Sequence, residues 1–190
     1  MQLFILNLVC SDGWTYFPNT GQCYRYFNQK LTWTEARAVC QNVNGGDLAS
    51  IHNKETNDFL YPLPRTSPDN HYYTWIGARR ADEHSDWRWS DGSSWDYSNW
   101  GTGKPTNLRT DDYGGINGGE EYVETRELGF WDNTDNTDDD RGAGFLCQYS
   151  PGKHVININI NTSHDPCFRT KLNHGLERKF LNFAGFKTEK

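Results

Sequence analysis

Tryptophan is concentrated in one short stretch of this chain, and that stretch limits the folds that the chain can adopt. Four of the eight tryptophans lie between Trp87 and Trp100, in the sequence WRWSDGSSWDYSNW. Trp87 and Trp89 are spaced as residues on one side of an extended segment, and Ser90-Asp91-Gly92 is typical of a turn. The stretch therefore predicts a short strand that leads into a long structured loop, with Trp131 as a further partner. Because long ordered loops in compact domains are usually functional, we expect the binding face here.

The cysteines indicate an oxidising compartment. The chain has five widely spaced cysteines and no CxxC or other metal-type spacing. In an aromatic, loop-rich chain this pattern predicts disulfides with one thiol left over, and hence a secreted or extracellular protein. The alternative is a set of buried reduced thiols in a cytosolic protein. The cysteines are Cys10, Cys23, Cys40, Cys147 and Cys167.

Charge divides the chain at about Gly152. The net charge is -6, but residues 153–190 carry seven Lys or Arg against three Asp or Glu, which leaves -10 on the first 152 residues. An acidic domain does not favour nucleic acid as a partner, since nucleic-acid surfaces carry clustered Lys and Arg. No stretch reaches the roughly 20 apolar residues of a membrane span, so no transmembrane segment is predicted.

One core domain with a tail is expected from 190 residues with 35% hydrophobic content. We assign residues 10–150 to the domain and residues 151–190 to a poorly ordered tail. Residues 1–9 are apolar without a basic region, so they are either a signal-peptide remnant or a first strand. Residues 155–161 alternate apolar and polar, as in an edge strand or a low-complexity connector. Asn161 begins the only glycosylation sequon.

Hydrophobic spacing predicts two helices and several short strands. Thr32-Trp-Thr-Glu35 is a capping box and predicts a helix from about Trp33 to Val43, with Cys40 on its buried face. A shorter helix is expected from Asn53 to Tyr61, ended by prolines. A hairpin is expected at residues 14–17 and 23–27, with further strands at 72–78, 122–125, 129–131 and 144–149. Glycines at 114, 115, 118 and 119 are expected to enlarge a loop before Glu120.

The chain from about Cys10 to Tyr149 resembles a C-type lectin-like domain. The resemblance implies an α+β fold, with two helices, small antiparallel sheets and a long structured loop. Each matching motif is short, but together they follow the family's order over about three-quarters of the chain. The motifs are Ala36-Arg-Ala-Val-Cys40, Asp47-Leu-Ala-Ser-Ile51, Trp75-Ile-Gly77, Trp87-Arg-Trp-Ser-Asp-Gly92, Tyr97-Ser-Asn-Trp100, Phe130-Trp131 and Gly144-Phe-Leu-Cys147.

The resemblance also implies a disulfide pattern. Cys40 would pair with Cys147, and Cys10 with Cys23 as in the long form of the family, which leaves Cys167 unpaired. The inner disulfide of the family is missing, since its first cysteine would fall at Tyr122 and its second within residues 132–141.

In sugar-binding members of the family, oxygen ligands hold a calcium ion. They come from a Glu-Pro-Asn or Gln-Pro-Asp motif with a cis proline, a following Glu, and an Asn-Asp pair after a Trp, and sugar hydroxyls complete the shell. The matching positions here begin with Lys104, whose ammonium replaces a carboxylate and would repel the ion. Three oxygen-bearing ligands for calcium remain. These three are Glu120, Asp132 and Asn133.

Two alternatives follow for this site. In the first, Asn107, Asp111, Asp112 and the acidic residues 132–140 replace the lost ligands, and calcium-dependent sugar binding persists. In the second, Lys104 pairs with Glu120 or Asp132, and the surface binds a glycan or a protein without calcium. A third interpretation of the acidic run is a solvated, flexible loop.

We therefore predict an extracellular, non-enzymatic module that binds a glycan or glycoprotein partner through the long loop. A calcium-independent protein-interaction domain is the alternative. Trp87, Trp89 and Trp100 are expected to pack beneath the loop, and catalysis is disfavoured because the histidines lack a matched nucleophile or metal spacing. The expected ligand-binding residues are Lys104, Pro105, Thr106, Asn107, Glu120, Asp132 and Asn133.

Overall fold

The computed structural model describes residues 2–8, 10–66, 73–107, 112–117, 128–136 and 144–159. The chain divides into two compact units, residues 7–154 and a unit made of residues 1–6 and 155–190. Strands β1 (Gln2–Leu8) and β10 (Lys153–Asn159) pair with each other in a two-stranded sheet. A strand was one of two alternatives for residues 1–9 and for residues 155–161, and the structure shows a strand in each of these segments. The domain boundaries themselves stay predictions. Among the described residues, the helices are too short or too polar to cross a membrane.

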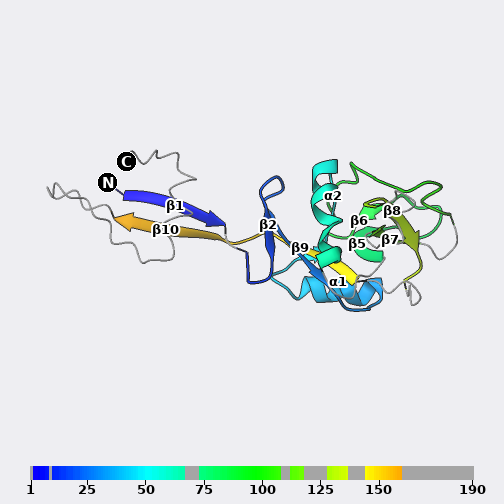
Figure 1. The fold of residues 1–190 in the computed structure, drawn as a ribbon, viewed down its shortest axis with the longest axis horizontal. Coiled ribbons are helices and arrows are strands. Elements are labelled where there is room, and N and C mark those ends of the chain that lie inside the picture. Colours follow the sequence, from blue (N-terminus) through cyan, green and yellow to red (C-terminus); the bar gives the residue numbers. More distant parts are fainter. Residues whose placement is uncertain are drawn as a thin grey trace. The chain divides into compact units, whose positions relative to one another are not determined.

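The larger unit is built on one eight-stranded sheet with strand order β2-β3-β9-β5-β7-β8 (Figure 1); β4 pairs with β9, and β6 pairs with β5. The sheet is mixed, because β5 and β9 pair in parallel while their other partners run antiparallel. The strands are β2 (Thr15–Phe17), β3 (Gln22–Phe27), β4 (Asp47–Leu48), β5 (Tyr73–Arg79), β6 (Arg88–Trp89), β7 (Tyr113–Asn117), β8 (Trp131–Thr134) and β9 (Gly144–Tyr149).

Both predicted helices are confirmed. Helix α1 (Trp33–Gln41) begins with the expected capping box: the backbone N–H of Glu35 donates to Thr32 Oγ1, and the N–H of Thr32 donates to the Glu35 carboxylate. It ends two residues before the predicted end, because Asn44 and Gly45 adopt positive φ. Helix α2 (Lys54–Leu60) follows the N-cap Asn53, and the short 3₁₀ helix η1 (Leu63–Thr66) comes next.

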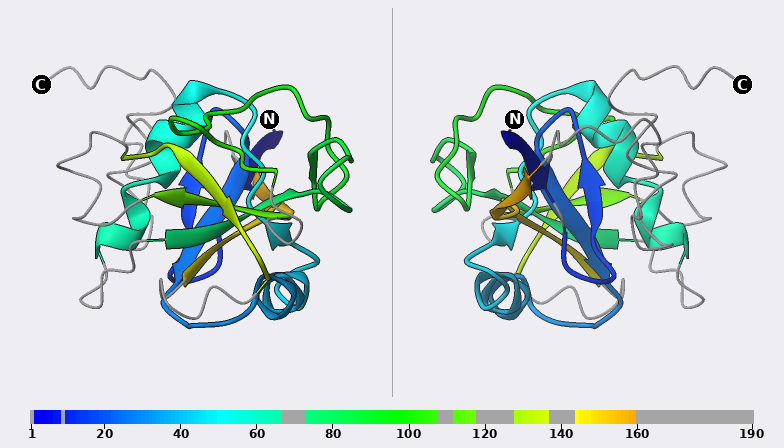
Figure 2. Two further views of the ribbon diagram at one scale, coloured as in Figure 1. Left: turned by 90° about the vertical axis from the view of Figure 1, so that its right-hand side faces the viewer. Right: turned by 90° about the vertical axis from the view of Figure 1, so that its left-hand side faces the viewer.

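The core consists of two clusters on the two faces of the sheet. Alternation along β5 directs Trp75 to one face and Ile76 to the other. Helix α1 packs against the Trp75 cluster, whereas Leu60 of α2 belongs to the Ile76 cluster. The two helices accordingly lie on opposite sides of β5 and β9 (Figures 1 and 2).

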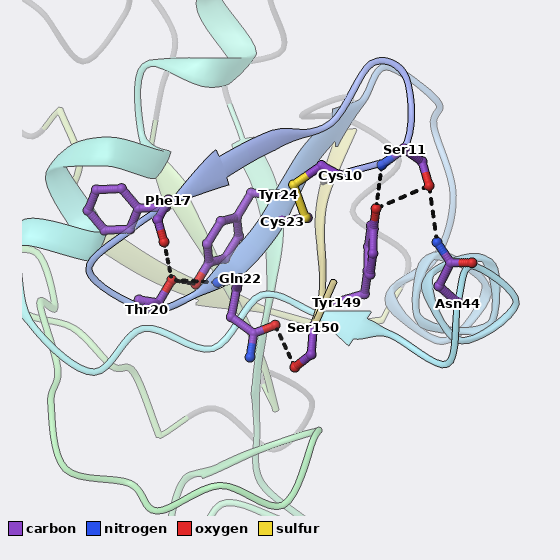
Figure 3. The surroundings of a disulfide bond; sticks show 10 residues. All are labelled: Cys10, Ser11, Phe17, Thr20, Gln22, Cys23, Tyr24, Asn44, Tyr149 and Ser150. Atoms are coloured by element: carbon purple, nitrogen blue, oxygen red, sulfur yellow. Dashed lines mark hydrogen bonds between the residues drawn. A yellow bond between two sulfur atoms is a disulfide. The ribbon is translucent and has the colours of Figure 1, made fainter. Parts of the chain in front are cut away.

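Two disulfides form as the resemblance implied. Cys40 of α1 is joined to Cys147 of β9, with Cα atoms 5.3 Å apart. Cys10 is joined to Cys23 of β3, with Cα atoms 5.7 Å apart. Beside the second bond, the Ser11 backbone N–H donates to the hydroxyl oxygen of Tyr149 at 2.6 Å (Figure 3). The N-terminal segment of the domain is thus fastened to β3 covalently and to β9 by hydrogen bonds.

Strand β7 corrects one sequence-based expectation. Gly114 and Gly115, which were expected in a loop, lie in β7 between β5 and β8. A Cβ on Gly114 would lie 2.7 Å from the Ala78 Cβ, and one on Gly115 would overlap the Tyr73 ring. The glycines are therefore needed for close packing within the sheet. The strand expected at residues 122–125 lies outside the described residues.

Candidate functional site

A cluster of five indole rings supports the long loop. Trp89 and Trp131 are buried, and Trp131 makes edge-to-face contacts with Trp89 at 5.5 Å and Trp100 at 5.6 Å between ring centroids. Trp87 and Trp95 are half-buried and stack on each other at 6.2 Å. The Trp131 indole N–H donates to Asn57 Oδ1 at 2.7 Å, which joins the cluster to α2. The tryptophans therefore pack beneath the loop, as the sequence indicated.

The segment from Lys104 to Asn107 follows this cluster. The Lys104–Pro105 peptide bond is cis. The backbone of the next residue, Thr106, is held by the Asn133 side chain: its N–H donates to Asn133 Oδ1 at 2.7 Å, and its carbonyl accepts from Asn133 Nδ2 at 2.9 Å. Residues about 27 positions apart in sequence thus form one surface.

Lys104 pairs with Asp132, one of the two partners named in the second alternative. Its Nζ lies 2.6 Å from Asp132 Oδ1, and the two side chains are 28% and 11% exposed. Asp132 Oδ1 also accepts from the Asn133 backbone N–H at 2.7 Å. Because an ammonium contacts this carboxylate and the Asn133 amide is bonded to Thr106, these residues do not fit a calcium ion in the arrangement that they adopt.

Arg80 is a buried cation that the sequence analysis missed. Its guanidinium is 2% exposed and donates to Asp112 Oδ1 at 2.8 Å, to Asn107 Oδ1 at 3.0 Å and to the Thr106 carbonyl at 3.1 Å. It also lies 5.2 Å from the centre of the Trp87 ring. One side chain thereby gathers three oxygen atoms of the long loop, as a bound cation would.

An open cavity of about 610 Å³ borders this loop. The half-buried indoles of Trp87 and Trp95 line it together with Pro105 and Asn107. Its remaining wall comes from Arg80 and from residues 83–86, which the sequence analysis did not select as binding residues. Asp82 shapes this wall, since it accepts hydrogen bonds from the Ser85 hydroxyl and the His84 backbone, and these bonds lower its pKa. The cavity combines aromatic rings with a few polar groups, which is typical of small-molecule sites.

The histidine that the structure engages most fully is His52. Its Nδ1 lies 2.7 Å from Asp96 Oδ1, and its Nε2 lies 3.2 Å from Ser50 Oγ. The geometry is like that of a nucleophile, base and acid, but Ser50 is only 4% exposed and its hydroxyl donates to Asp91 at 2.7 Å. These hydrogen bonds from Ser50 and His52 to Asp91 and Asp96 therefore join the Trp87–Trp100 loop to the core. His84 has an exposed position at the cavity, and His71 lies outside the described residues.

The structure brings together six of the seven expected ligand-binding residues. Lys104, Pro105 and Thr106 lie against Asp132 and Asn133 through the contacts above, and Asn107 joins them through Arg80. Within the described part of the chain, no group of three or more His, Cys, Asp or Glu side chains could hold a metal. Glu120, Asp111, Asn161, Cys167 and residues 137–140 of the acidic run lie outside the described residues.

A family model described as Lectin C-type domain matches residues 29–149, from just before α1 to the end of β9. The chain belongs to the C-type lectin family. One curated relative is the C-type lectin lectoxin-Lio1 of Erythrolamprus poecilogyrus, 38% identical over 105 residues that cover 55% of this chain and 63% of the relative. Another is the galactose-specific lectin nattectin of Thalassophryne nattereri, 35% identical over 96 residues that cover 50% of this chain and 58% of nattectin. This C-type lectin chain thus matches less than two thirds of the length of these relatives.

A solved structure confirms the α+β C-type lectin fold. A calcium-independent type II antifreeze protein superposes with a TM-score of 0.62 at 25% identity, over 77% of this chain and 97% of that protein. The fold is thus shared with a protein that is named for antifreeze activity and not as a lectin.

Proposed function

We propose that this C-type lectin domain is an extracellular, non-enzymatic module that binds glycans or glycoproteins without calcium. The observation that carries the proposal is the ion pair between Lys104 and Asp132 at 2.6 Å. A doubly charged ion 4 Å from an ammonium would be repelled by about 8 kcal/mol at an effective dielectric constant near 20. The protein's own cations, Lys104 and Arg80, stabilise the loop in place of the metal.

The cavity beside Trp87 and Trp95 supports a sugar as the ligand. Its volume of about 610 Å³ suits an oligosaccharide of a few rings, and indole surfaces bury the apolar side of such rings. Pro105 and Asn107 link the cavity to the loop that carries Lys104. The relatives are named as lectins, one of them galactose-specific, and we extend only the ligand class to this chain.

Two further observations support an extracellular, non-enzymatic role. The disulfides Cys10–Cys23 and Cys40–Cys147 favour an oxidising compartment. The serine nearest to a histidine, Ser50, is buried, so the arrangement favours structure over nucleophilic attack.

A calcium-independent protein-interaction domain is the second candidate. It is favoured by the engagement of the loop's polar groups within the protein, since Asn133 is bonded to Thr106 and Asn107 to Arg80. Fewer groups are then available to sugar hydroxyls at this loop than in a metal-centred site.

The test is a glycan array and a calorimetric calcium titration, each with calcium and with a chelator. The wild-type protein is expected to give no heat with calcium and the same glycan pattern in both conditions. Loss of all glycan binding in chelator would overturn the proposal, and an array without binding in either condition would favour the protein-interaction alternative.

A pair of variants isolates the role of Lys104. Lys104→Glu restores a carboxylate beside Asp132 and is expected to create a calcium-dependent rise in Tm. Lys30→Glu, at an exposed position, changes the net charge equally and is expected to create none. A calcium response that is the same in both variants would contradict the role assigned to Lys104.

A further inference from the structure

Four side chains on neighbouring strands form one row across the sheet. Arg88 of β6 pairs with Arg79 of β5, Arg79 also pairs with Tyr113 of β7, and Tyr113 pairs with Thr134 of β8. Directly opposed residues of antiparallel strands project from the same face, with Cβ atoms about 4.5–5.5 Å apart. The row therefore places two arginines, a tyrosine and a threonine next to one another on one face of the sheet.

The two arginines of this row have no acidic partner in the described part of the chain. Asp112, which precedes Tyr113, pairs with Arg80 at 2.8 Å, and Asp47, which accepts from the Ser90 hydroxyl, pairs with Arg37 at 3.0 Å. Arg79 Nε is buried without a hydrogen-bond partner in the structure. Like charges directly opposite each other destabilise a sheet, and a buried donor without an acceptor adds to that cost.

A shortage of acidic residues does not explain this arrangement, since the chain has 25 Asp or Glu against 19 Lys or Arg. The adjoining part of the same face is aromatic and holds Arg37, which is paired with Asp47. Arg37 donates to the carbonyl of Ser90, two residues after Arg88, at 2.6 Å. The Trp33 ring lies 5.9 Å from the Arg37 guanidinium carbon and 5.0 Å from the Tyr113 ring.

We propose that Arg79 and Arg88, with the Tyr113 hydroxyl, bind a tetrahedral oxyanion, the sulfate or phosphate group of a modified glycan. The planar guanidinium fork matches the oxygen edge of such a group and can donate two hydrogen bonds to it. The site is distinct from the cavity at Trp87, because Arg80 lines that cavity whereas Arg79, the last residue of β5, does not. The inference rests on the proposed function only in taking a sugar as the carrier of the anion.

The experiment measures binding of a sulfated heparin-derived oligosaccharide, its desulfated form and glucose 6-phosphate, all at one ionic strength. The sulfated or the phosphorylated probe is expected to bind, and the stronger of the two identifies the group. Arg79→Gln and Arg88→Gln are each expected to weaken that binding at least tenfold. Arg88→Lys keeps the charge but loses the fork, and a threefold or greater loss is expected.

Arg25→Gln is the control, because Arg25 is an exposed strand arginine that packs over Phe27. Equal weakening in Arg25→Gln would show that binding depends on net charge alone and would overturn the site. Equal binding of the sulfated and desulfated probes would overturn it as well.

Thermal unfolding supplies a second readout. Inorganic sulfate is expected to raise the Tm of the wild-type protein above a sodium chloride control of equal ionic strength, and to lose this effect in Arg79→Gln. The same shift in both proteins would contradict the site. Neutral glycans bound equally by both proteins, without any preference for sulfate, would leave the proposed function standing and remove this inference. A Tm shift with inorganic sulfate, together with an array on which no glycan binds, would keep the anion site and contradict the proposed function.

Discussion

Arg80 and Lys104 place two positive charges among the oxygen atoms of the long loop. Lys104 neutralises Asp132 at a half-exposed position, whereas Arg80 is buried and makes three hydrogen bonds to loop oxygens. A buried charge is stable only when it is paired and fully hydrogen-bonded, so the two residues differ in what their removal costs.

Arg80→Gln is expected to lower the free energy of unfolding by about 3 kcal/mol, because it leaves Asp112 without its partner in a largely buried position. Arg80→Lys retains the charge but cannot reach all three oxygens and should lose nearly as much. Urea denaturation measures both changes, with Arg25→Gln as the exposed control. A loss below about 1 kcal/mol, as for a surface pair, would contradict the buried role.

The buried phenol of Tyr24 is expected to make the stability of the folded protein depend on pH in the alkaline range. Burial raises the pKa of its phenol to about 12, from a usual value of 10.0. The unfolded chain ionises above pH 10 while the folded protein keeps the proton, so stability falls as the pH rises from 10 toward 12. The loss is about 2 kcal/mol at pH 12 relative to pH 9. Tyr24→Phe should remove this component in denaturation curves across the range, and parallel curves for the two proteins would refute it.

Strand β7 shows how an element can depend on the absence of side chains. Gly114 and Gly115 let β7 approach Ala78 and Tyr73 of β5, so that β8 can pair on its other edge. Strand β8 carries Asp132 and Asn133, and therefore the position of the candidate site depends on this close packing.

Gly115→Ala is expected to destabilise the protein by about 1–3 kcal/mol, because the added methyl group would overlap the Tyr73 ring. Gly152→Ala is the matched control, since a Cβ there meets nothing within 4 Å. Thermal and urea denaturation compare the two variants, and equal stability would show that β5 and β7 can separate without cost.

At the scale of the molecule, two covalent links hold the N-terminal segment of the domain and helix α1 to its sheet. Cys40 and Cys147 are 107 residues apart in sequence, and Cys10 and Cys23 are 13 apart. The entropy that a link removes from the unfolded chain grows with the enclosed loop, so the two links should contribute unequally.

The double variant Cys40→Ala with Cys147→Ala is expected to lose about 4–5 kcal/mol of unfolding free energy, and Cys10→Ala with Cys23→Ala about 3 kcal/mol. Denaturation of both under identical conditions tests the order. A larger loss from the short link would mean that local contacts around Cys10, such as Ser11 with Tyr149, outweigh chain entropy.

The sequence by itself determined both helices, because capping and hydrophobic period are local features. The order of its short motifs identified the family, and that resemblance implied the two disulfides and the site residues 104–107 and 132–133. Tertiary structure decided the partner of Lys104, the role of Arg80, and the assignment of Gly114 and Gly115 to a strand. Each of these depends on atoms brought together from distant segments, such as Asp112 beside Arg80. The row formed by Arg88, Arg79 and Tyr113 has the same origin, because strand register places them side by side.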